Sequence, residues 1–193
     1  MTKSEKTRRF IIEQSAAIFN KKGVAGTSIS DLMESTKLAK GGIYGNFNSK
    51  EEISVEVFDY LISIVSSALD TAAAGKTTAR EKLFAILDYY QNSLATSEMG
   101  GCPMLNFGTE ADDTNPDLRQ RVAKTIKKSE TRIARVIEEG QAAGEFGKRT
   151  DASIFAIKMF AMIEGAIFAS RVTNNKGLMK TIVDVLKKEI DAL

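Results

Sequence analysis

The sequence predicts an all-α fold, with an N-terminal three-helix helix-turn-helix domain followed by a six-helix domain. Ala, Leu, Ile, Lys and Glu are prominent among its 193 residues, and these residue types favour helix. Only two prolines interrupt the chain, and apolar residues recur at helical spacing. With 43% hydrophobic and 27% charged residues, the composition is that of a folded chain with a substantial core.

The first helix is predicted over Glu5–Lys22. Within it Ile12, Ala16 and Phe19 recur at i, i+4 and i+7, which places an apolar stripe on one face. Gly23 follows directly, and a glycine in this position is a common helix terminator.

Two short helices are predicted next. Ser28 is a good N-cap for the first of them, and Asp31, three residues later, supports its first turn. The chain then breaks near residues 36–38, and the second short helix covers Ala39–Gly45. Two short helices joined by a tight break form a helix-turn-helix, whose second helix enters the major groove of DNA. A small helical bundle of another kind has the same lengths and is the alternative.

Six further helices follow, separated by glycine-containing or capped turns. Ser49 is placed to cap the first of them, Asn115-Pro116 is typical of an N-cap before a first-turn proline, and Asp151 caps an apolar helix. The predicted helices cover residues 50–73, 79–96, 104–111, 116–143, 152–172 and 178–191.

Charge is unevenly distributed along the chain. Residues 1–50 hold nine Lys/Arg and four Asp/Glu, a net charge of +5, whereas the remaining residues hold eighteen and twenty-one, a net charge of −3. A basic N-terminal segment on a nearly neutral body indicates a polyanionic partner such as nucleic acid. A solvated basic surface is the alternative.

Several features predict a cytoplasmic protein with no membrane partner. Cys102 is the one cysteine, which rules out an intramolecular disulfide and fits a reducing compartment. The N-terminal residues lack the apolar core of a signal peptide. The most apolar stretch, Ile154–Ser170, is broken by Lys158 and Glu164, and we expect it to be too short and too polar to span a membrane.

The absence of histidine narrows the function classes. It removes Ser-His-Asp and Cys-His nucleophilic machinery and the common zinc sites. A carboxylate-based enzyme using Glu110, Asp112 and Asp113 is a rival reading, but no Glu-x-x-His motif accompanies these acids. The sequence therefore predicts no enzyme activity, no catalytic residue, no metal and no cofactor.

A set of spaced residues makes the helix-turn-helix prediction specific. They are Ile12, Ala16, Phe19, Gly23, Thr27-Ser28-Ile29, Leu32, Lys40-Gly41-Gly42-Ile43-Tyr44, Phe47 and Lys50-Glu51-Glu52. The pattern over about residues 7–53 closely resembles the DNA-binding domain of TetR/AcrR-family repressors. The resemblance implies a homodimeric transcriptional repressor, in which residues 1–48 read a palindromic double-stranded operator and residues 49–193 dimerise and bind a small-molecule effector.

The resemblance also implies which residues contact DNA. Lys40 and Tyr44 are the candidates for phosphate and groove contacts, and small residues at Gly41 and Gly42 let the helix approach the duplex closely. Partial burial is the alternative for Tyr44, and simple solvation is the alternative for Lys50. The predicted set is Thr27, Ser28, Ala39, Lys40, Gly41, Gly42, Tyr44, Asn46 and Lys50.

The sequence departs from the family pattern at three positions. Lys37 stands where the tight turn usually has a glycine, so we expect a turn that is built differently. Ala39 replaces a common serine, and Gly45 stands where an aromatic residue or histidine often contacts the backbone. Since few long side chains project from this helix, we expect DNA shape and phosphates to carry much of the binding.

Segments 101–106, 110–116 and 140–146 resemble the C-terminal domain of one branch of the same family. In this family the effector lies among the fourth to eighth helices, where polar tyrosines and adaptable methionines indicate an apolar or aromatic effector. Ordinary core packing is the alternative for these side chains. The candidate lining residues are Phe58, Leu61, Ile62, Ile86, Tyr89, Tyr90, Ser93, Cys102, Met104, Phe107, Phe155, Met159 and Met162.

Cys102 carries a separate hypothesis. It lies near a predicted helix start, where the helix dipole favours the thiolate, so it is a candidate sensor of oxidants or electrophiles. A small buried residue without reactivity is the alternative.

The last two helices are predicted to form a four-helix dimer interface, by resemblance and because small residues allow close helix approach. Packing within one chain is the alternative. The predicted interface residues are Ala161, Gly165, Ala166, Ala169, Ile182 and Leu186.

The expected mechanism is a population shift. An effector between the C-terminal helices pulls on the helix that follows the DNA-reading helices and changes their spacing in the dimer, and bound DNA reciprocally weakens effector binding. A ligand-binding protein of the same fold with weak or lost DNA specificity is the second function hypothesis, and an activator role is a third.

Overall fold

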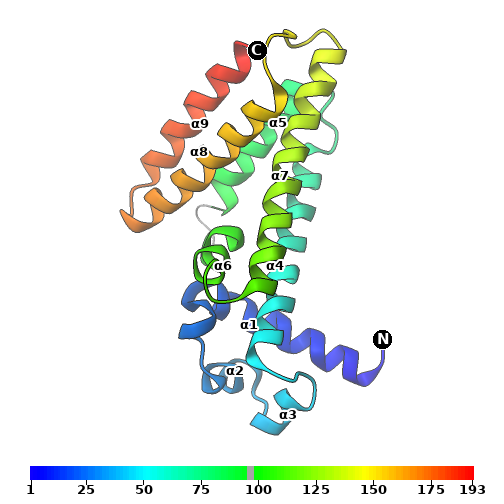
Figure 1. Cartoon of the computed structure of the whole chain (residues 1–193), viewed down its shortest axis with the longest axis vertical. Coiled ribbons are helices and arrows are strands. Elements are labelled where there is room, and N and C mark those ends of the chain that lie inside the picture. Colours follow the sequence, from blue (N-terminus) through cyan, green and yellow to red (C-terminus); the bar gives the residue numbers. More distant parts are fainter. Residues whose placement is uncertain (95–97) are drawn as a thin grey trace. The chain divides into compact units, whose positions relative to one another are not determined.

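The structure is a computed structural model that describes residues 1–94 and 98–193, with side chains for residues 1–92 and 98–193 (Figure 1). Every regular element in these ranges is helical, which confirms the predicted all-α class. The elements in order are α1 (Lys3–Gly26), α2 (Ile29–Thr36), α3 (Lys40–Tyr44), α4 (Lys50–Ala73), α5 (Ala79–Tyr89), the π-helical η1 (Tyr90–Leu94), α6 (Pro103–Ala111), α7 (Pro116–Ala142), α8 (Ala152–Val172) and α9 (Lys176–Asp191).

The predicted capping residues lie where the sequence placed them. In each case a side-chain oxygen accepts a hydrogen bond from the backbone N–H three residues later, which satisfies one of the unpaired donors of the first helical turn. These residues are Ser28 before α2, Ser49 before α4, Asn115 before α7 and Asp151 before α8.

Two predicted helices differ from the structure at their ends. Gly23, with φ 74° and ψ 176°, interrupts α1 as predicted, but a helical turn resumes after it and runs to Gly26. The helix predicted over 79–96 ends at Tyr89 and continues as η1. Residues 95–97 of that prediction lie outside the described residues.

The chain divides into two compact units, which are described separately. The first comprises Met1–Val65 and Glu98–Val122, and the second comprises Ser66–Ser97 and Ala123–Leu193. The first unit therefore includes α6, although α6 follows α5 in the chain. The predicted sequence boundary between residues 48 and 49 stays a prediction.

Each unit has its own apolar core. In the first unit α1, α2, α3 and the start of α4 enclose fully buried side chains, among them Phe19, Leu32, Ile43 and Ile53. In the second unit α8 packs along α9, and the core includes Leu83, Leu87, Met159, Ile163 and Leu186.

The expectation that the apolar stretch in α8 is too short and too polar to cross a membrane is wrong for length and composition. α8 has 21 residues, and its most apolar window has a mean hydropathy of 1.7. Its length follows from the Asp151 cap and from a helix that runs on through Val172. Nine residues of α8 are nevertheless buried within the second unit, as in a core helix of a folded domain.

Candidate functional site

α3 is a very short helix with one exposed side. Ile43 is fully buried and anchors it, whereas Lys40 and Gly41 are exposed and Tyr44 is 37% exposed. The Lys40 ammonium lies 5.9 Å from the centre of the Tyr44 ring, so the two predicted contact residues lie on the same side. A methyl group added at Gly41 meets nothing within 4 Å, so a partner can approach the backbone here without obstruction.

The turn before α3 corrects one expectation. Lys37 adopts the left-handed conformation, with φ 58° and ψ 21°, and is the C-cap of α2. The turn is thus built in the conformation that glycine adopts readily, and the lysine carries the steric cost. Ala39 is the N-cap of α3 and makes no side-chain capping bond.

The turn between α1 and α2 holds two other predicted contact residues. Thr27 is fully buried, and its hydroxyl donates to the carbonyl of Gly23 at 2.6 Å, so in this conformation the side chain faces the protein. Lys50 donates to the Thr27 carbonyl at 2.9 Å and ties α4 to the same turn. Ser28 is exposed at the start of α2, as an N-terminal phosphate contact requires.

The first turn of α2 is fixed by a capping box and an ion pair. The Asp31 carboxylate accepts from the Ser28 backbone N–H at 2.8 Å and pairs with the Lys22 ammonium at 2.7 Å. The bond from Lys22, followed by that from Ser28, lowers the pKa of Asp31 to about 2. The carboxylate is therefore ionised at neutral pH and keeps the α2 N-terminus ordered.

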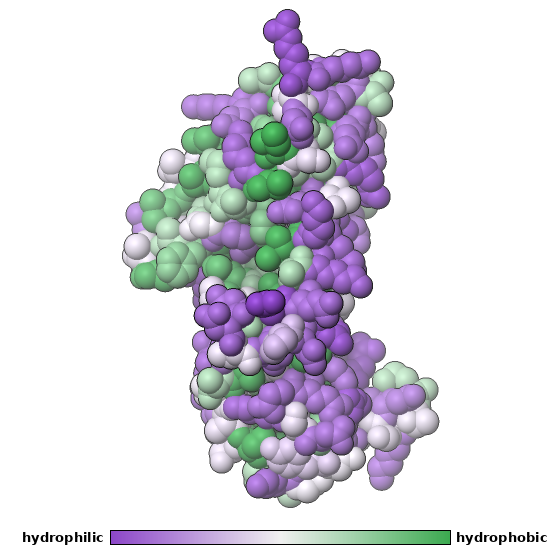
Figure 2. Space-filling model, viewed as in Figure 1, coloured by the Kyte–Doolittle hydropathy of each residue, from purple (hydrophilic) through white to green (hydrophobic). Residues whose placement is uncertain are grey.

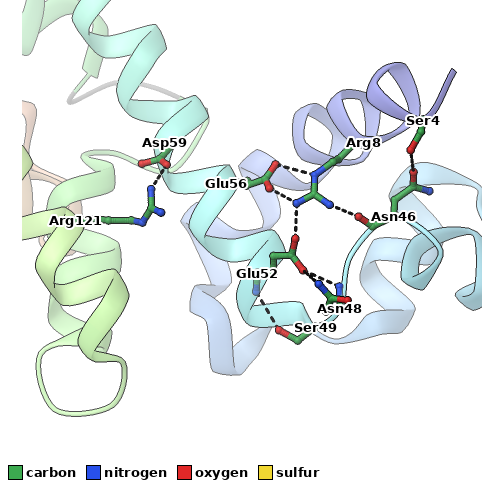
Figure 3. A network of polar contacts seen from close by, with 9 residues as sticks. All are labelled: Ser4, Arg8, Asn46, Asn48, Ser49, Glu52, Glu56, Asp59 and Arg121. Carbon is green, nitrogen blue, oxygen red and sulfur yellow. Dashed lines mark hydrogen bonds and ion pairs between the residues drawn. The ribbon is translucent and has the colours of Figure 1, made fainter. Parts of the chain in front are cut away.

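A network around Arg8 fixes the far end of α3 (Figure 3). From α1, Arg8 bonds to Glu52 and Glu56 of α4 and to the carbonyl of Asn46, and its guanidinium lies 4.0 Å from the centre of the Phe47 ring. The bonds to Glu56, and then those to Glu52, raise the pKa of Arg8. No local sequence pattern indicates this network.

Asn46, a predicted DNA contact, is engaged within the protein. Its side-chain amide donates to the Gly42 carbonyl at 2.9 Å, and its side-chain oxygen accepts from the Ser4 hydroxyl at 3.2 Å (Figure 3). Asn46 thereby closes the C-terminal end of α3 and links it to the start of α1.

Two protein-family models match this chain, one in its N-terminal part and one in its C-terminal part. Residues 11–57 match the model of bacterial regulatory proteins of the tetR family, and residues 79–186 match the tetracyclin repressor-like C-terminal domain. A TetR-family regulator from Cytophaga hutchinsonii is 38% identical, with a TM-score of 0.95 over 100% of this chain and 97% of that one. The chain belongs to the TetR family.

Two further relatives extend the comparison. A TetR regulator from Chloroflexus aurantiacus is 36% identical, with a TM-score of 0.93 over 98% of this chain and 96% of that one. The HTH-type transcriptional regulator TtgR of Pseudomonas putida is 27% identical over 85% of this chain and 80% of its own length. This TetR protein is therefore a DNA-binding transcriptional regulator with a C-terminal ligand-binding domain, and not an enzyme.

The candidate effector residues of this TetR chain fall in both units. In the first unit Phe58, Leu61, Cys102, Met104 and Phe107 are buried and Ile62 is half-buried, and the rings of Phe58 and Phe107 lie 5.6 Å apart. In the second unit Ile86, Tyr90, Phe155 and Met159 are buried, while Tyr89 and Met162 are half-buried. The Ser93 side chain lies outside the described residues. Their joint role as an effector pocket stays a prediction.

A surface groove of about 240 Å³ lies elsewhere on the second unit. It is lined by α7 and α8 and includes the charged residues Lys127, Glu130, Arg135 and Glu138. None of the predicted effector residues lines it, and its charged walls differ from the apolar site that the sequence predicts.

The predicted dimer residues of this TetR chain divide into exposed and buried ones. Ala161 and Gly165 are exposed on α8, and Ala169 and Ile182 are half-buried. Ala166 is 5% exposed and Leu186 is fully buried, so both pack within the chain and are corrected to core residues. The small size of Ala166 serves the contact of α8 with its own unit.

Sequence reasoning missed the large apolar residues beside them. Ile154, Ile157, Phe168 and Val172 are 67%, 48%, 57% and 69% exposed on α8, and Figure 2 shows hydrophobic residues at the surface over this helix. Together with Ala161 and Gly165 they recur every three or four residues along α8, and this helical spacing is the sequence signal that could have identified the exposed apolar face. Leu178 and Val185 extend the exposed apolar set onto α9. These residues are called the α8–α9 face below.

Proposed function

We propose that this chain is a homodimeric transcriptional repressor that binds a palindromic operator in the cytoplasm and is released by a small apolar or thiol-reactive effector. The observation that carries the proposal is α3, where exposed Lys40 and Tyr44 flank the unobstructed backbone of Gly41. Such a helix can enter the major groove closely and contact phosphates from its edges.

The α8–α9 face supports the homodimer. Six large apolar side chains are exposed there, and Gly165 has open space at its Cβ position, so a second helix can pack closely against α8. A second copy related by a two-fold axis buries the same face on both chains. Two-fold symmetry also places two α3 helices against the two halves of a palindrome, roughly 34 Å apart.

Cys102 supports a thiol-reactive effector as one form of the proposal. It is the N-cap residue of α6, and it is 1% exposed. A reagent that modifies this thiol must move the start of α6 to fit. We expect a thiol-reactive compound to release wild-type protein from DNA and to leave the Cys102→Ser variant bound, whereas equal release of both proteins excludes a role for this thiol.

A ligand-binding protein with weak or lost DNA specificity is the alternative. Ala39 gives α3 no side-chain cap, and the helix spans only five residues with two adjacent glycines. The missing cap leaves the start of α3 less stabilised, and the short length and the glycines leave few side chains to read bases.

Selection from a random duplex library, followed by sequencing of the bound pool, separates the two functions. Recovery of one inverted repeat supports the dimeric, sequence-specific regulator. Weak, salt-sensitive enrichment without a common sequence supports the alternative, because phosphate contacts alone give binding of that kind.

A further inference from the structure

α6 is fixed to α1 through a pair of asparagines. The Asn106 side-chain amide donates to the carbonyl of Asn20 at 2.8 Å and to that of Gly100 at 2.9 Å. The buried Asn20 side-chain amide donates in turn to the carbonyls of Met99 and Gly101 at 2.8 and 3.2 Å. The start of α6 and the segment before it are thereby held against the last complete turns of α1.

A second attachment lies at the other end of α6. The Glu110 carboxylate accepts from the backbone N–H groups of Val24 at 2.6 Å and Ala25 at 2.5 Å, one with each oxygen. These N–H groups open the short helical turn that resumes after the break at Gly23. The carboxylate replaces helical carbonyl partners that the break removes, and its charge suits the positive end of that turn.

Gly23 makes this attachment sterically possible. Its φ of +74° belongs to glycine, and a Cβ atom there lies 2.5 Å from Glu110 Oε2. The break in α1 and the carboxylate on α6 are therefore fitted to each other.

The attached turn leads directly into α2. The Thr27 hydroxyl bonds back to the Gly23 carbonyl, Lys50 holds the Thr27 carbonyl, and Ser28 is the N-cap of α2. Only two residues separate Ala25 from Ser28, so a displacement of the turn must displace the first turn of α2.

We propose that Glu110 is a positioning residue for DNA binding, and that its carboxylate sets where α2 begins and hence how its N-terminus meets a phosphate. This inference rests on the DNA-binding function proposed above. It gives α6 a direct route to the DNA-reading helices through α1.

The second unit contains a matched control. The Glu145 carboxylate accepts from the backbone N–H groups of Ala79 and Arg80, each at 2.8 Å, and so caps α5 in the same two-oxygen manner. Glu110→Gln and Glu145→Gln remove the same charge and the same kind of acceptor, but only the first touches the turn before α2.

The first measurement is amide hydrogen exchange by NMR on the DNA-free protein. Glu110→Gln is expected to speed exchange at Val24 and Ala25 and also at Asp31 and Leu32 in α2 by about tenfold, while Glu145→Gln leaves all four unchanged. If exchange becomes faster only at Val24 and Ala25, Glu110 stabilises its own turn without positioning α2, and the proposal is overturned.

The second measurement is DNA affinity as a function of salt, using the duplex recovered by selection. A helix N-terminus is equivalent to about half a positive charge. Because each fully neutralised phosphate contributes about 0.9 to the slope of log K against log salt concentration, loss of this contact is expected to make the slope shallower by about 0.5 and to lower affinity several-fold at 0.1 M salt. We expect this for Glu110→Gln and wild-type behaviour for Glu145→Gln. A wild-type slope for Glu110→Gln overturns the proposal, because mere destabilisation lowers the active fraction without changing the slope.

The two measurements distinguish a failure of the proposed DNA-binding function from a failure of the proposed positioning role of Glu110. If wild-type protein binds no duplex at any salt concentration, the proposed DNA-binding function is wrong. The exchange measurement uses no DNA and tests the link from α6 to α2 independently.

Discussion

Two glycines of the first unit are small for opposite reasons. At Gly23 the protein itself fills the space, since a side chain there collides with Glu110 and the backbone needs a positive φ. At Gly41 the protein leaves the space open and the backbone conformation is helical. The missing side chain at Gly41 therefore has no explanation within the chain, and a close-lying partner supplies one.

Gly41→Ala tests this explanation. Alanine favours helix over glycine by roughly 0.5–1 kcal/mol and meets no atom here, so we expect unchanged or slightly higher thermal stability. We expect at least a tenfold loss of DNA affinity, measured by fluorescence anisotropy, because the methyl group holds α3 away from the groove. Unchanged affinity with the fold intact means that DNA does not approach this backbone.

Lys37 is a residue under conformational strain. A left-handed conformation costs an ordinary residue roughly 1–2 kcal/mol, and glycine avoids the cost. We therefore expect Lys37→Gly to stabilise the protein by about 1 kcal/mol in denaturant unfolding. Lys37→Ala removes the charge but keeps the strain, so equal stabilisation by alanine assigns the gain to charge instead.

The short helix α2 depends on its capping carboxylate. The pKa of Asp31 is about 2 in the folded protein, and an unfolded aspartate has a pKa of about 3.9. The folded value is the lower one, so Asp31 contributes stability above pH 4 and loses that contribution as pH falls toward 2.

Asp31→Asn is expected to lower Tm at pH 7, and the difference from wild type is expected to shrink as pH falls below 4. Carboxyl-carbon NMR gives the pKa directly. A titration midpoint near 3.9 contradicts the capping role, as does a Tm difference that is independent of pH.

Local signals explain which elements the sequence predicted well. Ser28, Ser49 and Asp151 each accept a hydrogen bond from the backbone N–H three residues ahead, so their capping role depends only on neighbours in the chain. Glu110 and Val24 lie 86 residues apart in the sequence, and Arg8 and Glu56 lie 48 residues apart, so no local sequence pattern predicts either contact. The network around α3 and the attachment of α6 therefore emerged only from the three-dimensional structure.

α8 shows a second limit of pattern reading. It is apolar on the face that packs within the second unit and on the face that is exposed, so periodicity does not separate one from the other. The small residues of α8 predict an interface, but Ala166 is buried in the core of the second unit. For the same reason the periodicity does not identify Ile154 and Phe168 as exposed side chains.

The α8–α9 face predicts that two copies of the chain associate. Phe168→Glu places a charge on a face that a second copy is proposed to bury, so we expect a monomer by sedimentation velocity and much weaker operator binding. Ile64→Glu is the matched control, because Ile64 is 43% exposed on α4 and lies outside this face. A dimer that survives Phe168→Glu requires another interface.

The first unit consists of two separate segments, which limits how it can be joined to the sensor domain of another protein. Residues 98–122, including α6, fold with residues 1–65, and the segment between them belongs to the other unit. A chimera that grafts only the first fifty residues onto a foreign sensor leaves Val24 and Ala25 without the Glu110 carboxylate and exposes the buried Asn20. The part of the chain that must be transferred together therefore consists of two separate segments, residues 1–65 and 98–122. We expect chimeras that carry both segments to bind the same operator as the parent protein, and chimeras that carry only the first segment to lose that operator.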